Sequence, residues 1–356
     1  MRTSRVLPFP HFLPSPHFLA FPLVVALLAG CGQNQGPTVA DNPAPPRPEV
    51  NAPASSAPSN PSDMSLVIIS PALTSVFHQE FIKGAEEAAR QRGWQFSHLE
   101  PDRETNSADQ VMKVQDSLQR GVKAISICAV NDEALVQAVK KANEANVPIF
   151  VHNSITEVPE GKVEAYIGYD EREGGRRCGE KAVELLKAKY GGAAKGKVAI
   201  LEGTAGLHTE QRAGGFKEAL RGTDIQVVAS TAANWVRQDG AVKTTDILQK
   251  YPDLDLVFGC SDAMAQGAAQ AAKRAGKQVI TIGLDGNPDA LADVKAGSLT
   301  ATLVVYPRKM GEKTVEVIEE RLRAKAGAAG RVVRTETVIA DKSNVEEFIG
   351  ASGPGG

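Results

Sequence analysis

Short apolar runs alternate with amphipathic segments along the chain from residue 65 onward. Residues 65–70 (SLVIIS) form an apolar, β-branched run that is typical of a buried parallel strand. Phe77, Phe81, Ala85 and Ala88 then recur at helical spacing. The same alternation predicts further strands at 95–99, 124–130, 148–152 and 165–168, and helices that end near 93, 121 and 147. Alternating strands and helices predict a parallel sheet with right-handed crossovers.

The pattern begins again after residue 168 and predicts a second, similar half. A helix is expected at 171–190, and strands at 197–202, 225–231, 254–259 and 278–283 alternate with helices at 209–221, 240–250 and 262–275. A strand at 299–305, a helix at 307–324 and a strand at 331–339 complete the pattern. Two similar α/β halves favour two lobes that face each other across a cleft, where ligand sites are common.

Residues 281–289 (TIGLDGNPD) carry the clearest local signal for a site. Gly283 and Gly286 permit a tight turn after an apolar strand, and Asn287 followed by Pro288 is typical of a helix start. Asp285 is therefore expected at the carboxyl end of a strand, the edge at which open parallel sheets bind ligands. The alternative is that Asp285 caps the next helix.

The N-terminus predicts an export signal. Arg2 and Arg5 precede an apolar segment at 18–30, which is shorter than a comfortable membrane span and ends in small residues. The ending LAGC (28–31) resembles the lipobox of bacterial lipoproteins, which implies a signal peptide at 1–30, cleavage before Cys31 and a lipid on its thiol. Acyl chains bind membranes through their buried methylene groups. An ordinary signal peptide with a chance cysteine is the alternative.

Residues 31–63 are rich in Pro, Ala, Asn and Ser. Such a segment buries too little apolar area to fold, and we expect a disordered tether. A lipid followed by a tether predicts a domain held at a membrane, in the periplasm or at the outer face of the cell envelope.

Composition narrows the function further. The 356 residues have a formal net charge of −2, so no basic field indicates nucleic-acid binding. The spacing of Cys128, Cys178 and Cys260 suggests neither a disulfide framework nor a zinc site, and we expect buried, inert thiols. No metal or cofactor is predicted.

Six short motifs recur in one order along the chain. They are FIKGA (81–85), ANEANVP (142–148), RAGGF (212–216), SDAMAQGA (261–268), IGLDGNPD (282–289) and GSLTAT (297–302). Together they resemble the type I periplasmic binding proteins for sugars, the ribose-, galactose- and allose-binding group, over residues 65–348.

That resemblance implies the fold and the function. The fold is α/β, with two similar doubly wound parallel-sheet lobes joined by three crossovers near Gly168, Tyr306 and Thr335. The N-terminal lobe is 64–168 plus 307–334, and the C-terminal lobe is 169–306 plus 335–350. The family implies a monomer that captures a small carbohydrate between its lobes and delivers it to an ABC transporter permease.

The resemblance also implies a set of ligand-binding residues. Sugars need hydrogen bonds around the ring, strongest from charged groups, and an aromatic face against their C–H surface. The aromatic positions correspond to Phe77 and Trp235, with His78 in place of a second aromatic. Arg212 and Asp285 match the charged positions. Phe77 could instead be a core residue, and Arg212 a surface helix residue.

Four further positions complete the set. Asn153 and Ser154 follow the strand at 148–152, where the family has an acid and an arginine. Ser261 and Asp262 follow the strand at 254–259, although Asp262 could instead cap the next helix.

Several departures imply a pocket less polar than a ribose site. Besides Asn153 and Ser154, these are Ser75, Cys128 and Val305, each at a position where the family has a polar amide or another polar group. A different pentose or hexose, a deoxy or substituted sugar, a polyol or autoinducer-2 all stay open as ligands.

The sequence bears on three alternative functions. A repressor of the lactose-repressor type would need an N-terminal helix-turn-helix, whereas residues 1–63 predict a signal and a tether. An enzyme is disfavoured because no G-x-S-x-G, H-E-x-x-H or Walker A motif occurs. A sensor that reports to a membrane receptor would use the same fold and the same site.

Overall fold

The computed structural model describes residues 63–103, 106–324 and 329–349. All of them belong to one compact unit, Pro53–Gly356. The expected signal peptide (1–30), Cys31 and all but the last residue of the expected tether (31–63) lie outside the described residues. Within those residues, no helix combines the length and the hydrophobicity that crossing a membrane requires.

The first of two six-stranded sheets has the strand order β11-β5-β4-β3-β1-β2, and its strands pair in parallel. Its strands are β1 (Ser65–Ile69), β2 (Gln95–Leu99), β3 (Ala124–Ile127), β4 (Ile149–His152), β5 (Ala165–Gly168) and β11 (Arg331–Arg334). Four helices pack against this sheet: α1 (Val76–Gln91), α2 (Ser107–Gln119), α3 (Asp132–Glu144) and α9 (Pro307–Arg323). We call this group the first lobe.

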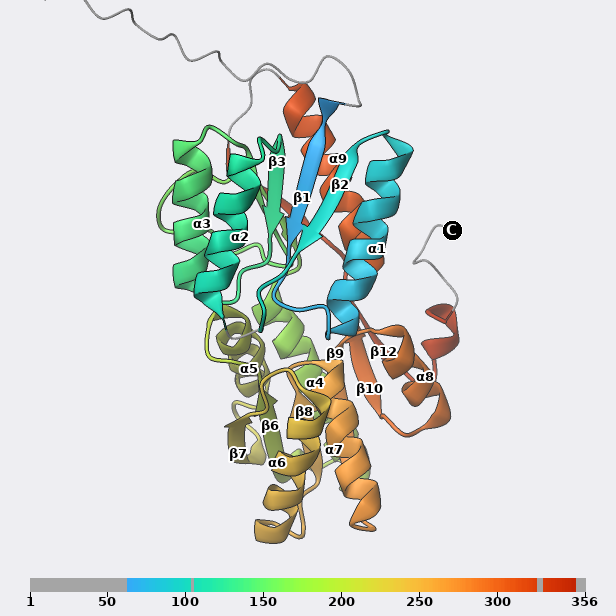
Figure 1. The fold of residues 1–356 in the computed structure, drawn as a ribbon. Helices are drawn as coiled ribbons and strands as arrows, with labels where there is room; N and C mark the ends of the chain where they lie inside the picture. Colours follow the sequence, from blue (N-terminus) through green and yellow to red (C-terminus); the bar gives the residue numbers. More distant parts are fainter. Residues whose placement is uncertain (1–62, 104–105, 325–328, 350–356) are drawn as a thin grey trace, which may run out of the picture. The chain divides into compact units, whose positions relative to one another are not determined.

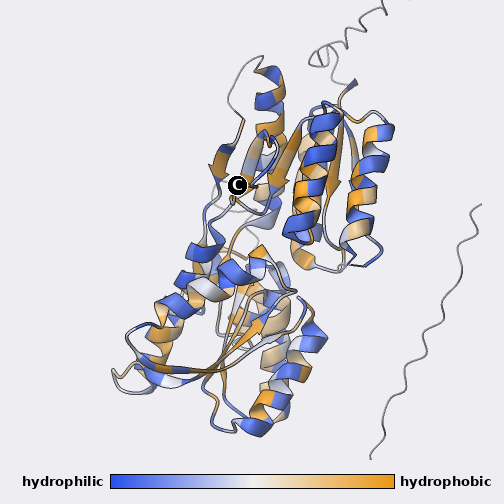
Figure 2. Cartoon of the chain, turned by 90° about the vertical axis from the view of Figure 1, so that its left-hand side faces the viewer, coloured by the Kyte–Doolittle hydropathy of each residue, from blue (hydrophilic) through white to orange (hydrophobic). Residues whose placement is uncertain are grey.

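Helices cover both faces of the first sheet (Figure 1). Leu66 and Ile68 of β1 belong to a hydrophobic cluster with Phe81 of α1 and Met310 of α9. The alternate β1 residues Val67 and Ile69 belong to a different cluster, with residues of α2 and α3. Because successive side chains of a strand point to opposite faces, a strand that is buried on both faces is apolar throughout, as β1 is. Figure 2 shows this in the mostly hydrophobic colouring of the strands.

The second sheet has the order β12-β10-β9-β8-β6-β7. Its strands are β6 (Lys195–Glu202), β7 (Asp224–Ala232), β8 (Leu256–Gly259), β9 (Ile280–Asp285), β10 (Ala301–Val304) and β12 (Val338–Asp341). The helices of this second lobe are α4 (Glu171–Lys189), α5 (Leu207–Ala219), α6 (Arg237–Lys250), α7 (Asp262–Arg274) and α8 (Pro288–Ala296), and a 3₁₀ turn, η2 (Val345–Glu347), follows β12. Two mostly parallel six-stranded sheets with this order confirm the predicted fold class.

The chain passes between the sheets three times: between β5 and α4, between β10 and α9, and between β11 and β12. The single strand predicted at 331–339 is therefore wrong. Residues 331–334 pair in parallel with β5, whereas residues 338–341 pair antiparallel with β10 in the other sheet. Each segment contains two adjacent apolar β-branched residues, Val332 and Val333 in the first and Val338 and Ile339 in the second, so the strand pattern appeared continuous. The break between them falls at the third crossover that the family resemblance implies, near Thr335.

Candidate ligand-binding site

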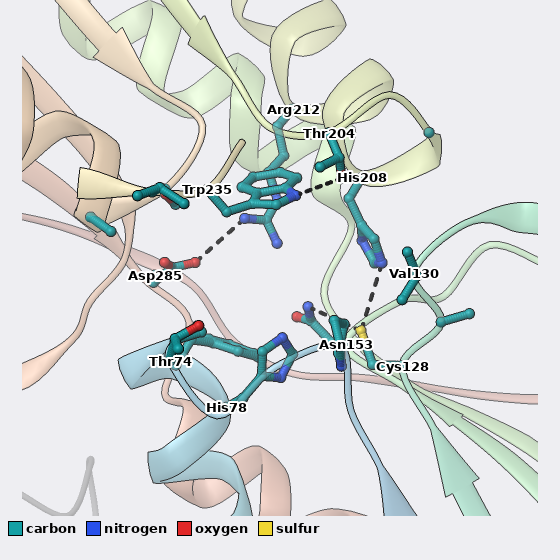
Figure 3. Close-up of a pocket in the computed structure, with 18 of the residues that line it drawn as sticks. Thr74, His78, Cys128, Val130, Asn153, Thr204, His208, Arg212, Trp235 and Asp285 are labelled. Carbon is teal, nitrogen blue, oxygen red and sulfur yellow. Dashed lines mark hydrogen bonds and ion pairs between the residues drawn. The ribbon is translucent and has the colours of Figure 1, made fainter. Parts of the chain in front are cut away.

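A cavity with a volume of about 540 Å³ lies at the carboxyl ends of strands from both sheets. Its size is typical of a small-molecule site. Residues that follow β1, β3 and β4 line one part, and residues of α5, α6 and the segments after β8 and β9 line the other. Figure 3 shows the side chains of both parts pointing into the same space. The predicted residues that line the cavity are Phe77, His78, Asn153, Ser154, Arg212, Trp235, Ser261 and Asp285.

Arg212 is the centre of a buried charge cluster. Its Nε donates to Glu171 Oε1 at 2.8 Å, and its Nη1 donates to the carbonyl of Cys260 at 2.9 Å and to Asp285 Oδ1 at 3.4 Å. Close contact between α4 and α5 creates this arrangement, because a Cβ added to Gly175 would lie 2.0 Å from the carbonyl oxygen of Arg212. Nη2 has no hydrogen-bond partner among the residues that the structure describes. The guanidinium is thus held in place with donor capacity to spare.

Glu171 and His208 belong to the same cluster and were not predicted. The His208 Nδ1 lies 2.8 Å from Glu171 Oε2. Burial by itself raises the pKa of Glu171, but the charges of His208 and Arg212 outweigh it and the pKa is lowered. Burial by itself lowers the pKa of His208, but the Glu171 carboxylate and the contact with Cys128 together outweigh it and raise the pKa to about 10. Both groups are therefore charged at neutral pH.

Asp285 lies at the end of β9, as predicted. Its backbone has a φ of +146°, a value that residues other than glycine rarely adopt. Burial raises its pKa to about 7, although the nearby Arg212 charge acts in the opposite direction. Its Oδ2 accepts hydrogen bonds from the Asp262 amide at 3.4 Å and the Asn287 side chain at 3.5 Å. Since Asn287 is the cap residue of α8, Asp285 is not the cap of that helix.

Trp235 lies in the loop between β7 and α6, where Asn234 and Trp235 both have positive φ values. Its indole N–H donates to Thr204 Oγ1 at 3.0 Å. The ring lies directly against Gly203, where an added Cβ would be 1.9 Å from ring carbon Cε2. The Arg212 guanidinium carbon is 5.3 Å from the ring centroid. The half-buried indole therefore has a fixed orientation beside the charge cluster.

Phe77 and His78 enter the cavity from the start of α1. Phe77 is 3% exposed and belongs to the hydrophobic core, so most of its ring packs against protein, although it also lines the cavity. His78 contacts Phe77 edge-on at 5.1 Å between ring centroids. Burial is the main cause that lowers the pKa of His78 to about 3, so this imidazole is neutral. Its Nδ1 has no hydrogen-bond partner among the described residues.

Asn153, Ser154 and Cys128 form the neighbouring part of the cavity surface. Asn153 adopts a φ of +62°, and its Nδ2 donates to Cys128 Sγ at 3.9 Å. The sulfur also lies 3.7 Å from His208 Nε2, a contact that joins the two lobes. Ser154 Oγ accepts the Thr156 amide at 3.2 Å. Cys128, Cys178 and Cys260 are buried and free, as predicted, yet Cys128 also lines the cavity.

Asp262 departs from the prediction because it does not line the cavity. It is fully buried behind Asp285, where it accepts hydrogen bonds from Thr302 Oγ1 at 2.5 Å and from the Asn287 amide at 2.8 Å. The cap of α7 is Ser261, whose Oγ accepts the Met264 amide at 3.4 Å. Asp262 thus holds the turn that carries Asp285, and neither predicted role applies to it.

The sequence contained part of the information needed to predict Glu171 and His208. His208 and Arg212 are four residues apart on α5, and positions i and i+4 share one face of a helix. Glu171, by contrast, is on a different helix, and only the packing of α4 against α5 brings it to them. Within the described residues, no group of three or more His, Cys, Asp or Glu side chains could hold a metal ion.

Residues 66–326 match the family described as the periplasmic binding protein domain, and the chain belongs to this family. The ribose import binding protein RbsB of Bacillus subtilis is 34% identical over 254 residues, which are 71% of this chain and 80% of the relative. These matches confirm the predicted class, a binding protein and not an enzyme.

Solved structures of solute-binding proteins of ABC transporters are similar as well. One from Actinobacillus succinogenes, with bound D-allose, is 27% identical with a TM-score of 0.72 and covers 80% of this chain and 99% of that one. One from Agrobacterium vitis, with bound D-fucose, is 30% identical with a TM-score of 0.70 and covers 80% of this chain and 97% of that one.

Proposed function

We propose that this chain is the extracytoplasmic solute-binding protein of an ABC transporter and that it captures a monosaccharide in the cavity. The names of the similar proteins, which include ribose, D-allose and D-fucose, support this ligand class. The observation that carries the proposal is the convergence of Arg212, Asp285 and Trp235 on one cavity. Charged hydrogen-bonding groups beside an aromatic face suit the two kinds of surface that a sugar presents.

The three side chains have separate roles in this proposal. Ionised Asp285 accepts hydrogen bonds from two neighbouring hydroxyls, and Nη2 of Arg212 donates to a ring or hydroxyl oxygen. The indole face of Trp235 covers the C–H surface of the ring. On the first lobe, Asn153 and His78 contribute uncharged polar groups. A ligand that contacts both lobes favours the closed state by its differential affinity for that state.

The proposal includes the domain organisation expected from the sequence. The lobes are 64–168 plus 307–334 and 169–306 plus 335–350, which agrees with the sheet that each strand joins. The chain acts as a monomer that presents its ligand to a permease. The signal at 1–30, the lipid on Cys31 and the tether at 31–63 hold it at the outer face of a membrane.

A ligand panel tests the central claim. The chain from residue 32 onward is heated with pentoses, hexoses, deoxy sugars and polyols, and hits are measured by calorimetry. A ligand at a hundred times its dissociation constant adds about 2.7 kcal/mol of stability, a readable shift in Tm. Absence of any shift with millimolar sugars would contradict the proposal.

The anchor is tested separately in cells. Metabolic labelling with a fatty acid should mark the full chain, and Cys31→Ala should abolish the label and release the protein from membranes. A labelled Cys31→Ala variant, or an unlabelled and membrane-free native chain, would rule out this anchor.

A further inference from the structure

We infer that the ligand presents a carbon without a hydroxyl, a methyl or methylene group, to one side of the cavity, and so is a deoxy sugar. This inference rests on the proposed function. The side in question consists of Cys128, Ala129, Val130, Leu135 and Val151, which we call the apolar wall. All five residues line the cavity.

The fold brings the residues of the apolar wall together from two neighbouring strands and the helix α3. Cys128, Ala129 and Val130 directly follow β3, Leu135 lies in the first turn of α3, and Val151 belongs to the neighbouring strand β4. Each side chain is hydrophobic, and all except Val130 are buried. A ligand that contacts this wall therefore meets carbon and sulfur atoms.

Three backbone groups of the wall already have hydrogen-bond partners within the protein. Gln110 of α2 is fully buried, and its Nε2 donates to the carbonyl of Cys128 at 2.9 Å. Its Oε1 accepts the amide of Val130 at 2.8 Å. The amide of Cys128 donates to the carbonyl of Ile69 at 3.0 Å. These groups, which often bind ligand hydroxyls at strand ends, already have partners in this chain.

The polar atoms nearest the wall are partly engaged. Cys128 Sγ lies within hydrogen-bond reach of two nitrogens, His208 Nε2 at 3.7 Å and Asn153 Nδ2 at 3.9 Å. His152 also lines the cavity and pairs through Nδ1 with Ser126 Oγ at 2.9 Å, whereas its Nε2 has no hydrogen-bond partner among the described residues. A ligand hydroxyl directed at the five side chains of the wall itself would lose its water and gain at most a weak bond to sulfur from them, which costs binding free energy.

Groups that can serve hydroxyls lie elsewhere in the cavity. Figure 3 shows Asp285 and Trp235 on the side away from Cys128 and Val130. Asn153, whose Oδ1 has no partner among the described residues, borders the wall and can accept from an adjacent hydroxyl. The ligand is thus oriented with its hydroxylated edge toward Arg212 and Asp285 and its bare carbon toward the wall.

Matched sugar pairs test this inference by calorimetry on the mature chain. The pairs are D-fucose with D-galactose, L-rhamnose with L-mannose, and 2-deoxy-D-ribose with D-ribose. In the pair that fits the cavity, the deoxy member should bind about tenfold more tightly, the effect of one unpaired hydroxyl. Val130→Thr places a hydroxyl on the wall at nearly constant volume and should reduce that ratio severalfold. Cys128→Ser should act in the same direction if Val130→Thr fails to fold.

Val242→Thr is the matched control. Val242 is exposed on α6 and does not line the cavity, so this variant should leave the ratio unchanged. If every sugar that binds does so at least as tightly in its hydroxylated form, the inference is overturned and the proposed function stands. An unchanged deoxy preference in both Val130→Thr and Cys128→Ser would also overturn it. If no sugar binds, both the proposed function and this inference are wrong.

Discussion

The second lobe brings five ionisable residues to the cavity surface: His208, Arg212, Arg237, Asp285 and Asp289. Glu171, which does not line the cavity, pairs with His208 and Arg212, Arg212 pairs with Asp285, and Arg237 pairs with Asp289. The first lobe brings Asn153, the neutral His78 and the apolar wall to the other side. Its one acidic lining residue, Asp132, is exposed at the start of α3. The two lobes have the same architecture, yet they present different chemistry to the same cavity.

On the proposed function, this difference gives the second lobe the role of affinity and the first lobe the role of selectivity. The charged groups of the second lobe are already hydrogen-bonded without a ligand, so little ordering entropy is lost when a ligand arrives. Such a preorganised surface supplies affinity. The first lobe has few fixed charges to satisfy, and its shape and polarity decide which ligand permits closure. The predictions below test this division, from the largest expected effect to the smallest.

Arg212→Ala should abolish measurable binding and lower the free energy of unfolding. Removing one partner of a buried ion pair costs roughly 3–5 kcal/mol, because the other charges stay buried without it. Calorimetry and urea unfolding measure the two effects. Arg172→Ala is the control, since Arg172 is 46% exposed and pairs with Glu218 at the surface. Wild-type affinity in Arg212→Ala would show that the charged side does not bind the ligand.

Asp285→Asn should weaken binding by roughly 1.5–3 kcal/mol, the usual value of a hydrogen bond to a charged group. The pKa of Asp285 is raised to about 7 by burial, so the wild-type carboxylate becomes ionised as pH rises through that value. Affinity should therefore increase between pH 6 and pH 8 and then level off.

The free energy of unfolding, in contrast to the affinity, should decrease as pH rises. A carboxyl with a raised pKa binds more protons when folded than when unfolded, so its contribution is lost as pH rises from its unfolded value toward about 7. The pH dependence of affinity should be absent from Asp285→Asn, and the decline in stability below about pH 7 should be smaller than in the wild type. That decline should not vanish, because the pKa of the buried Asp262 is also raised. An unchanged decline in the variant would show that another group is responsible.

Gly203→Ala should displace the Trp235 ring, because the added methyl group has no room beside it. We expect roughly tenfold weaker binding, since aromatic contacts contribute about 0.5–1.5 kcal/mol beyond buried area. Tryptophan fluorescence reports the movement directly, with Trp94, which is half-buried against the core and does not line the cavity, as a constant background. Thr204→Val removes the hydrogen bond to the indole and should have a smaller effect in the same direction. An unchanged emission spectrum in Gly203→Ala would contradict this account.

His208→Gln should have the smallest effect on affinity, within about threefold, because Glu171 keeps its bond to Arg212. The effect on stability depends on pH. The pKa of His208 is raised from 6.5 to about 10 by Glu171, so its stabilisation is complete below pH 6.5 and lost as pH rises toward 10. Urea unfolding should show this decline in the wild type and not in the variant. A decline that remains in His208→Gln would refute the assignment.

The pattern of residues along the chain was sufficient to predict features that a single segment creates. The strand, Gly turn and helix start around Asp285 are adjacent in the chain, and the structure has Asp285 at the end of β9. The apolar runs predicted both sheets, because a strand that is buried on two faces must be apolar throughout. Trp235 stands in a polar loop of the sequence, and in the structure it is half-buried, packs against the hydrophobic core and lines the cavity.

Local pattern failed where distant segments meet. Asp262 follows a strand end and was predicted to bind ligand, but its carboxylate accepts hydrogen bonds from Thr302 of β10 and the Asn287 amide and does not line the cavity. Phe77 follows a strand end, yet its helix turns most of the ring into the core. The partition of residues 331–341 between two sheets depends on which strand edge is open at each place, β5 or β10.

The sequence by itself determined the two-lobed α/β fold, the family and the strand end that carries Asp285, because periodicity and turn residues act over a few neighbouring positions. The tertiary structure alone decided that Glu171 joins His208 and Arg212, and that Gln110 occupies the backbone behind the apolar wall. Charge pairing and desolvation depend on distances of a few ångströms between helices far apart in the chain, and no pattern along one segment contains those distances.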